Sequence, residues 1–485
     1  ARAHVVPWIA RNPKNGTLVI ADTENRTKKT VDVYISTDEG RSWGRGGDPM
    51  VKPWTDSSGD PEANINHTML YDQDGVLYLA FQANDPQFSN DLRADRPRHI
   101  FLARSEDDGR TFRTVKVFDA PESRDAPRSA GKRNNRPWVA VDPNDPQYVY
   151  VSWMQWHTND EPTPSGNKAL IAVSVNGGRA FGAPFSLREG DPQGSYEARP
   201  AVDRHGTVHV VMAGRAFVPP GTPQGTLAPI RTVNYRFSTD RGATWSEAVQ
   251  IEEGSAGFAH NRKWGLRADP NSDTLYAIWY GSTNNRPATN PPDDRDVFLR
   301  VSYDSGRTWG DRVLVNDSAP LNNLHAFDPN LAVAPNGRLD VAWFDNRNSP
   351  VQAAPGNTGF QDVWYSYSTD GGRTFSPSIK VTDRMIDRRF GIWSNNVDVH
   401  APVGLISTDD TVYFTWQDSR NGTTPEGSAE DTYFASAHFN ELGATGDPVA
   451  EDDDDAPAWL LIGGGLALGM GVAMVLALAL GRRRA

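Results

Sequence analysis

Short segments rich in histidine, arginine and acidic residues precede several apolar runs of the chain, and four of the ten histidines lie in them. A planar guanidinium can donate two parallel hydrogen bonds to one carboxylate. Two carboxyl groups, or a carboxyl group and a tyrosine, can serve as nucleophile, acid and base. We therefore take as candidate site residues His67, Arg136, Tyr196, Glu197, Arg199, His260, Arg262, His325, Asp328, Asp398 and His400.

A second pattern, Asp-x-Arg, follows two apolar runs that each contain a tryptophan near the end. Asp345 with Arg347 and Asp418 with Arg420 form the two copies. One interpretation is an ion pair that supports the rim between neighbouring units, because paired charges are more often structural than catalytic. The other interpretation is that these four side chains face a ligand, and both remain open at this stage.

A polar turn that occurs six times in the sequence indicates the elements that must position these residues. Its serines are 69, 69, 64, 64 and 66 residues apart, by subtraction of their numbers. Each copy lies between two short alternating runs, so it predicts a hairpin in which Ser and Asp bond turn amides and Gly supplies a positive φ angle. We call this turn the latch; its copies are "STDEGRSW" at Ser36, "SEDDGRTF" at Ser105, "SVNGGRAF" at Ser174, "STDRGATW" at Ser238, "SYDSGRTW" at Ser302 and "STDGGRTF" at Ser368.

A second hairpin lies between successive latches, and seven such hairpins occur. In the seventh unit Ser436 follows Ser368 by 68 residues, where a further, altered copy of the latch is due. Four strands per unit, repeated seven times, predict an all-β propeller with seven four-stranded blades, since no unit can bury its sheet alone. Six blades are the alternative. The outermost strand of the last unit is not visible, and we expect the extreme N-terminus or residues upstream of Ala1 to supply it.

The Ser-x-Asp-x-Gly-x-Thr-Trp/Phe pattern resembles the Asp box, or BNR repeat, of sialidase-like propellers, over residues 1–440. The same turn occurs in sialidases, xyloglucan-degrading enzymes, sorting receptors and photosystem assembly factors, so it indicates fold more than chemistry. The resemblance implies that the first strand of each blade lines a central channel. It also implies that the latches lie on the face opposite the ligand site, so that the polar segments converge at the channel mouth.

The resemblance further implies roles for these residues. Arg136, Arg199 and Arg262 are comparable to the arginine triad with which sialidases hold a substrate carboxylate. Tyr196 or Glu197, with Asp328 or Asp398, would supply nucleophile and acid/base. The expected function is a sialidase-like glycoside hydrolase acting on anionic or polysaccharide glycans; the alternative is a non-catalytic propeller that binds glycans or an envelope protein partner.

Composition excludes several classes of site and partner. The chain has no cysteine, so disulfides, thiolate catalysis and cysteine-based zinc sites are absent. A net charge of −12 gives no indication of a nucleic-acid surface. We expect no cofactor: the calcium-like stretches "DQDG" at 72–75 and "DPND" at 142–145 are typical hairpin turns, and a three-histidine metal site could only form across blades.

The C-terminal region predicts a membrane anchor. Residues 458–481 are uncharged and long enough to span a hydrocarbon core of about 30 Å as a helix. "RRR" at 482–484 follows, which places residues 482–485 in the cytoplasm and the propeller outside the cell. An acidic stalk, residues 441–457, would join propeller and helix. A buried helix is the alternative interpretation.

Overall fold

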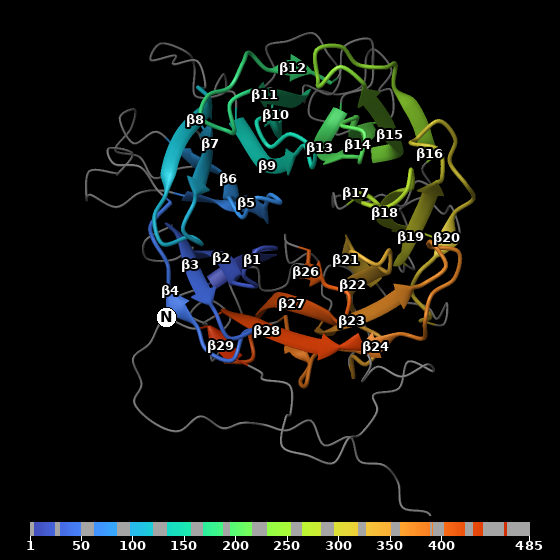
Figure 1. Ribbon diagram of the computed structural model, residues 1–485. Helices are drawn as coiled ribbons and strands as arrows, with labels where there is room; N and C mark the ends of the chain where they lie inside the picture. Colours follow the sequence, from blue (N-terminus) through green and yellow to red (C-terminus); the bar gives the residue numbers. More distant parts are fainter. Residues whose placement is uncertain are drawn as a thin grey trace, which may run out of the picture.

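The computed structural model describes residues 4–24, 30–49, 63–84, 98–119, 133–156, 168–187, 195–215, 230–253, 264–282, 295–318, 326–350, 359–388, 390, 402–421, 430–439 and 460–462. Within these ranges the regular structure is β-strand throughout. The strands form seven four-stranded blades around a central axis, which confirms the predicted fold (Figure 1).

Each blade is an antiparallel meander that runs from the axis outwards. The first three blades are β1 (His4–Arg11), β2 (Leu18–Glu24), β3 (Thr30–Ser36) and β4 (Gly44–Arg45); β5 (Ala63–Tyr71), β6 (Leu77–Asn84), β7 (Arg98–Ser105) and β8 (Arg113–Phe118); β9 (Arg133–Val141), β10 (Val149–Trp156), β11 (Lys168–Ser174) and β12 (Phe185–Ser186). A single parallel pair, Arg98 with Arg133, connects the second and third blades.

The remaining blades repeat the plan. They are β13 (Ser195–Val202), β14 (Val208–Arg215), β15 (Ile230–Ser238) and β16 (Val249–Glu253); β17 (Trp264–Ala268), β18 (Leu275–Ser282), β19 (Arg295–Ser302) and β20 (Val313–Leu314); β21 (Ala326–Val333), β22 (Leu339–Asp345), β23 (Phe360–Ser368) and β24 (Ile379–Lys380), with β25 (Ile386–Asp387) also on β23; and β26 (Gly404–Ser407), β27 (Thr411–Asp418), β28 (Asp431–His438) and β29 (Leu460–Ile462). The strands β1, β5, β9, β13, β17, β21 and β26 surround the axis (Figure 1).

The six latches form the same hydrogen bonds. In every copy the serine hydroxyl donates to the Asp, or in the third copy Asn176, at 2.7–2.8 Å. The latch glycine four residues after the serine donates its N–H to the serine Oγ at 2.7–2.9 Å. These glycines have φ angles between +78° and +90°, a region that other residues rarely adopt. The predicted hairpin turn is therefore confirmed in all six copies.

Each latch also packs against the third strand of the preceding blade. A Cβ atom added to Gly306 would lie 1.9 Å from the Tyr235 hydroxyl, and one added to Gly178 would lie 2.8 Å from Leu102. The same relation holds for Gly109 with Val33, Gly242 with Val173, Gly372 with Leu299, and Gly40 with Phe434. The last contact joins the first blade to the seventh, so the latches couple blades around the ring.

The closure of the ring differs from the expectation. Residues Leu460–Ile462 pair with β28 and supply the outermost strand of the seventh blade, while the N-terminal residues from His4 form the inner strand of the first blade. The prediction that the N-terminus completes the last blade was therefore wrong. The two blades meet through a buried apolar cluster of Ile9, Leu18, Ile20, Tyr413 and Phe434.

The predicted stalk, residues 441–457, and most of the predicted membrane helix lie outside the described residues. Leu460–Ile462 belong to the predicted helix and form a strand instead. Among the described residues no helix is long and apolar enough to cross a membrane. The membrane anchor stays a prediction.

Candidate functional site

A bulge interrupts the inner strand of five blades near its start. The register shifts between Val5 and Trp8 in β1, and at the matching place in β5, β9, β13 and β21. In four of them the first bulged residue has a positive φ: Val6 (57°), Arg136 (57°), Glu197 (29°) and Asp328 (55°). Such angles cost roughly 1–3 kcal/mol each in residues other than glycine. Arg136, Glu197 and Asp328 therefore occupy one structural position in three blades.

Neighbouring blades hold the bulges in place. The Arg136 N–H donates to Gln82 Oε1 on β6 at 2.8 Å, and the Val6 N–H donates to Gln417 Oε1 on β27 at 3.1 Å. Both glutamines lie on the second strand of the preceding blade. The Trp264 indole donates to the Glu197 carbonyl at 2.9 Å from the following blade. These contacts fix the backbone from which the candidate side chains project.

A small pocket lies among the bulged strands. Its size fits roughly one or two water-sized groups rather than a whole sugar ring. The pocket unites four of the predicted site residues, His67, Arg136, Glu197 and Arg199, which come from three blades. Its full lining is Val6, Trp8, Asn66, His67, Thr68, Arg136, Pro137, Trp138, Glu197, Arg199 and Pro402.

Glu197 is the centre of a buried ion-pair network. Its Oε2 lies 3.1 Å from Arg136 Nη1 and its Oε1 lies 3.4 Å from Arg199 Nη2, with all three side chains at least nine-tenths buried. The Trp138 indole donates to Oε1 at 2.9 Å. Burial raises the pKa of Glu197, but Arg136, Arg199 and Trp138 outweigh burial and leave the pKa below its ordinary value. Glu197 is thus ionised at neutral pH and can accept a proton but not donate one.

Arg199 lies between this carboxylate and an aromatic wall. Its guanidinium carbon is 3.9 Å from the centre of the Trp138 ring, a cation–π arrangement. The side chain is 2% exposed, and its Nε and Nη1 have no hydrogen-bond partner among the described residues. Two buried donor nitrogens of this arginine thus have no acceptor among the described residues.

Among the described residues, positive charge exceeds negative charge around Arg199. Burial lowers the pKa of Arg199 to about 10; Glu197 opposes this change, and the neighbouring cations Arg267 and Arg136 add to it. Burial likewise lowers the pKa of Arg267 to about 10. All of these guanidinium groups are still protonated at neutral pH. Among the described groups named as acting on Arg199, two are cations and one, Glu197, is a carboxylate.

His67 lines the pocket as a neutral side chain. Burial lowers its pKa to about 4, and a hydrogen bond to the Ala21 carbonyl partly opposes this. Nε2 lies 2.9 Å from that carbonyl and Nδ1 lies 3.2 Å from the Thr23 hydroxyl. Both ring nitrogens are therefore engaged with the first blade, and His67 contributes shape and neutrality at the pocket.

The two Asp-x-Arg pairs lie outside the pocket lining and share one geometry. Arg347 Nη2 is 2.7 Å from Asp345 Oδ2, and Nη1 reaches Asp317, in the segment that follows the preceding blade's outer strand, at 2.7 Å. Arg420 is bound by Asp418 at 2.7 Å and by Asp383, from the preceding blade, at 2.6 Å. Both arginines thus connect neighbouring blades, as the structural interpretation expects.

The remaining predicted residues are placed only in part. Asp328 is fully buried in β21 at the bulge position shared with Glu197. Tyr196 lies on β13, where its backbone pairs with Ala213. His260, Arg262, His325, Asp398 and His400 lie outside the described residues. The catalytic and binding roles assigned to all these residues stay predictions.

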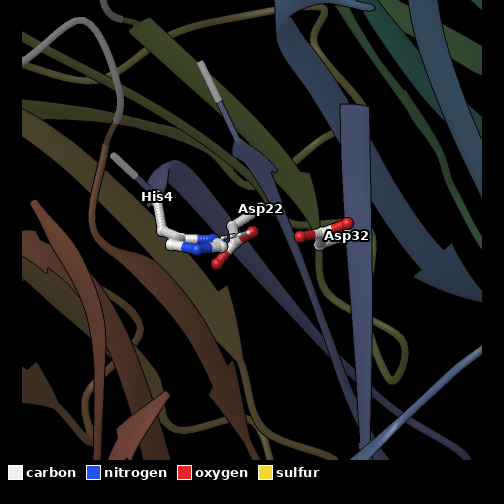
Figure 2. Close-up of side chains that lie close together, drawn as sticks. All are labelled: His4, Asp22 and Asp32. Carbon is white, nitrogen blue, oxygen red and sulfur yellow. Dashed lines mark hydrogen bonds and ion pairs between the residues drawn. The ribbon is translucent and has the colours of Figure 1, made fainter. Parts of the chain in front are cut away.

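The stretches weighed as calcium ligands are hairpin turns. Asp72 Oδ1 accepts the N–H groups of Asp74 and Val76 at 2.9 Å, and Asp142 Oδ1 accepts the N–H of Asn144 at 2.8 Å. The described residues do contain one group suited to a metal, namely His4, Asp22 and Asp32 (Figure 2). Sequence reasoning missed it because the three residues lie on three strands, although an Asp inside the apolar run "LVIADTE" was a visible signal.

Comparisons with known proteins agree with the fold. No protein-family model matches the sequence, and no curated protein matches it. Among solved structures, an ulvan lyase of polysaccharide lyase family PL25 has a TM-score of 0.53 at 11% identity, over 92% of this chain and 98% of its own. An α-L-arabinanase from Penicillium chrysogenum has a TM-score of 0.46 at 15% identity, and the match covers 70% of this chain and 88% of the arabinanase. A Hadza microbial sialidase has a TM-score of 0.44 at 14% identity, and the match covers 87% of this chain and 76% of the sialidase. The chain is a seven-bladed β-propeller whose fold the ulvan lyase shares.

Proposed function

We propose that the protein binds an anionic polysaccharide, one that carries uronate or sulfate groups, at the mouth of the propeller channel and cleaves it. The observation that carries the proposal is the excess of guanidinium groups at and beside the pocket among the described residues. Arg199 keeps two donor nitrogens without a protein acceptor among the described residues, and Arg136 and Arg267 add positive charge beside it.

Buried cations of like charge are unfavourable unless an anion compensates them. Glu197 neutralises one positive charge and is shared by two arginines. A carboxylate or sulfate group from a ligand would accept from at least one of the two Arg199 nitrogens that lack a partner among the described residues, and it would lower the repulsion from Arg267. Because the pocket is small, it suits one such group of a sugar residue rather than the whole ring.

The reaction class follows from what the described side chains can do. An ionised Glu197 is unsuited to the general-acid step of glycoside hydrolysis. Neutralising a uronate carboxylate with arginine favours removal of the neighbouring proton. In an elimination that proton would pass to a base, for which ionised Glu197 is a candidate, while the bond to the glycosidic oxygen breaks and that oxygen leaves with a proton from solvent. The ulvan lyase has been solved with a -[GlcA(1-4)Rha3S]- ligand. We infer that elimination fits the arginine-rich pocket, with hydrolysis by a Tyr196 and Asp398 pair as the second candidate.

The location of the protein at the cell surface is part of the proposal. Residues 463–481, the uncharged part of the predicted span that follows β29, and the arginines after them support a single-pass anchor with the propeller outside the cell. The glycan ligand in the ulvan lyase structure supports a glycan as partner. A surface propeller that binds glycans or an envelope protein without turnover is the alternative that the test below separates.

The test is a panel of polyuronates and sulfated polysaccharides, each paired with its own carboxyl-reduced or desulfated form. We expect binding and cleavage of a charged member and at least tenfold weaker binding of its uncharged counterpart. New ultraviolet absorbance from an unsaturated uronate identifies elimination, and new reducing ends without it identify hydrolysis. Binding without either product indicates the non-catalytic propeller. Equal binding of charged and uncharged forms contradicts an anion site.

A further inference from the structure

His4, Asp22 and Asp32 form a buried cluster where the first blade meets the seventh (Figure 2). His4 Nδ1 lies 3.0 Å from Asp22 Oδ1, and one ligand atom from each of the three residues lies within 4.8 Å of the others. The relative exposures are 1%, 0% and 5%. The three residues come from β1, β2 and β3, and Asp22 and Asp32 are directly paired across β2 and β3.

Comparison of the six latch-bearing blades shows that the two aspartates occur in the first of them alone. Asp22 lies four residues beyond the residue that pairs with the latch serine, Leu18. The same position in the other latch-bearing blades holds a large buried apolar side chain: Phe81, Trp153, Met212, Trp279 and Trp343. Core packing therefore does not explain an aspartate there, and a propeller blade forms readily without one.

The position of Asp32 shows the same departure. It lies four residues before the latch serine, where the other blades have Phe101, Leu170, Asn234, Phe298 and Trp364. Two adjacent carboxylates in a buried position repel each other unless positive charge lies between them. Of the nearby cations, Arg45 bonds to Asp32 at 2.9 Å but its side chain is 61% exposed. A single imidazolium on His4 can balance one carboxylate only.

The histidine itself is incompletely satisfied. His4 Nε2 is buried and has no hydrogen-bond partner among the described residues. The two carboxylates, in contrast, are held from outside the cluster. Thr432 Oγ1 on β28 donates to Asp22 Oδ2 at 2.7 Å, and Arg45 donates to Asp32 Oδ1. Such outer hydrogen bonds are the ones that orient ligating carboxylates in metal sites.

We propose that His4, Asp22 and Asp32 bind one divalent transition-metal ion of the Zn²⁺ or Mn²⁺ class. One imidazole and two carboxylates form a mixed donor set that suits these ions. Metal–ligand distances of about 2.0–2.2 Å need the three donors to move together by roughly 1 Å, which side-chain rotation can supply. The ion replaces the proton shared by His4 and Asp22, and that proton passes to solvent.

Because the cluster lies where the first and seventh blades meet, a bound ion would stabilise the contact between them. The His4 N–H donates to the Glu430 carbonyl at 2.7 Å, and Thr432 bonds to Asp22, so the seventh blade touches the cluster directly. No strand is exchanged between these two blades among the described residues. A bound ion therefore stabilises the joint at which the ring closes, and its binding raises the melting temperature.

The test uses the protein treated with EDTA and then titrated calorimetrically with Zn²⁺ or Mn²⁺, with metal content and melting temperature measured in parallel. We expect one ion per chain and a higher melting temperature. Asp22→Asn and Asp32→Asn should each weaken binding at least tenfold. His209→Gln is the matched control, because His209 and Asp203 form a buried pair at 3.1 Å that belongs to no three-residue metal-suited group among the described residues. This variant should bind metal as the wild type does.

A second measurement needs no variant that could fail to fold. Co²⁺ added to the chelated wild-type protein should give visible absorption bands of a nitrogen- and oxygen-ligated site, and Zn²⁺ should displace it. The proposal is overturned if the wild type binds none of these ions. It is equally overturned if both asparagine variants bind with wild-type affinity.

Discussion

The latches and the channel mouth are built on opposite principles. In the latches both the residues and the hydrogen bonds repeat, six times over, and each glycine packs on the preceding blade. At the mouth the backbone bulge repeats while the side chain at the same position changes, from Val6 to Arg136, Glu197 and Asp328. In the latches the repeated residues maintain the packing between blades. In the bulges of the inner strands only the backbone conformation repeats, so the side chains there can differ and can carry chemistry.

The largest expected effect concerns the ion-pair network of the mouth. Glu197→Gln leaves Arg136 and Arg199 buried without their carboxylate and should lower the free energy of unfolding by roughly 3–5 kcal/mol. Glu252→Gln is the control, because Glu252 pairs with Arg300 and Arg312, which are partly exposed. We expect about 1 kcal/mol or less for that variant in denaturant unfolding. Equal losses for the two variants would show that burial of the mouth network has no special weight.

The next effect concerns the latches. Gly306→Ala places a Cβ 1.9 Å from the Tyr235 hydroxyl at a φ of +83°, so we expect a loss of about 2–4 kcal/mol from strain and steric overlap. Gly337→Ala has nearly the same φ, +86°, but its nearest contact is 4.0 Å away, and it should lose only about 1–2 kcal/mol. Thermal unfolding of both variants measures the difference. If they melt together, the contact between latch and preceding blade contributes nothing to stability.

A smaller effect is the acid sensitivity of a latch. Hydrogen bonds from the Thr244 hydroxyl and amide and from the Ser238 hydroxyl lower the pKa of Asp240 to about 2. A carboxylate with a lowered folded-state pKa stabilises the protein above its unfolded pKa, about 4, and loses that contribution as the pH falls towards 2. Asp240→Asn should therefore show a shallower fall in stability between pH 5 and 2 than the wild type. An unchanged slope contradicts this assignment.

The same contrast explains how far the sequence could be read. The fold was predictable because Ser, Asp and Gly at fixed spacing form a local turn whose hydrogen bonds span four residues. For His67, Arg136, Glu197 and Arg199, the sequence could predict that their segments converge but not which side chains contact one another. The bulges show that Arg136 and Glu197 occupy matching positions in their blades, and that Arg199 matches Trp138. Arg136 and Arg199 are therefore two positions out of step, which only the strand register reveals.

Two features escaped prediction for physical reasons. The last outer strand comes from Leu460–Ile462, an apolar segment whose composition suits a membrane helix as well as a strand, so the pattern alone favoured the wrong element for these residues. The cluster of His4, Asp22 and Asp32 depends on pairing between β2 and β3 and on contact with the seventh blade. Both features are set by tertiary contacts rather than by local sequence.

The central claim is that the side chains that vary at the channel mouth form an anion site, and Arg199 tests it most directly. We would titrate a polyuronate oligosaccharide calorimetrically into the wild type, into Arg199→Gln and into Arg338→Gln, a control that removes a buried arginine paired with Asp340 in the sixth blade. Losing charge-assisted hydrogen bonds at Arg199 should weaken binding roughly tenfold to a hundredfold, with Arg338→Gln unchanged. Wild-type affinity in folded Arg199→Gln would contradict the account and place the ligand elsewhere.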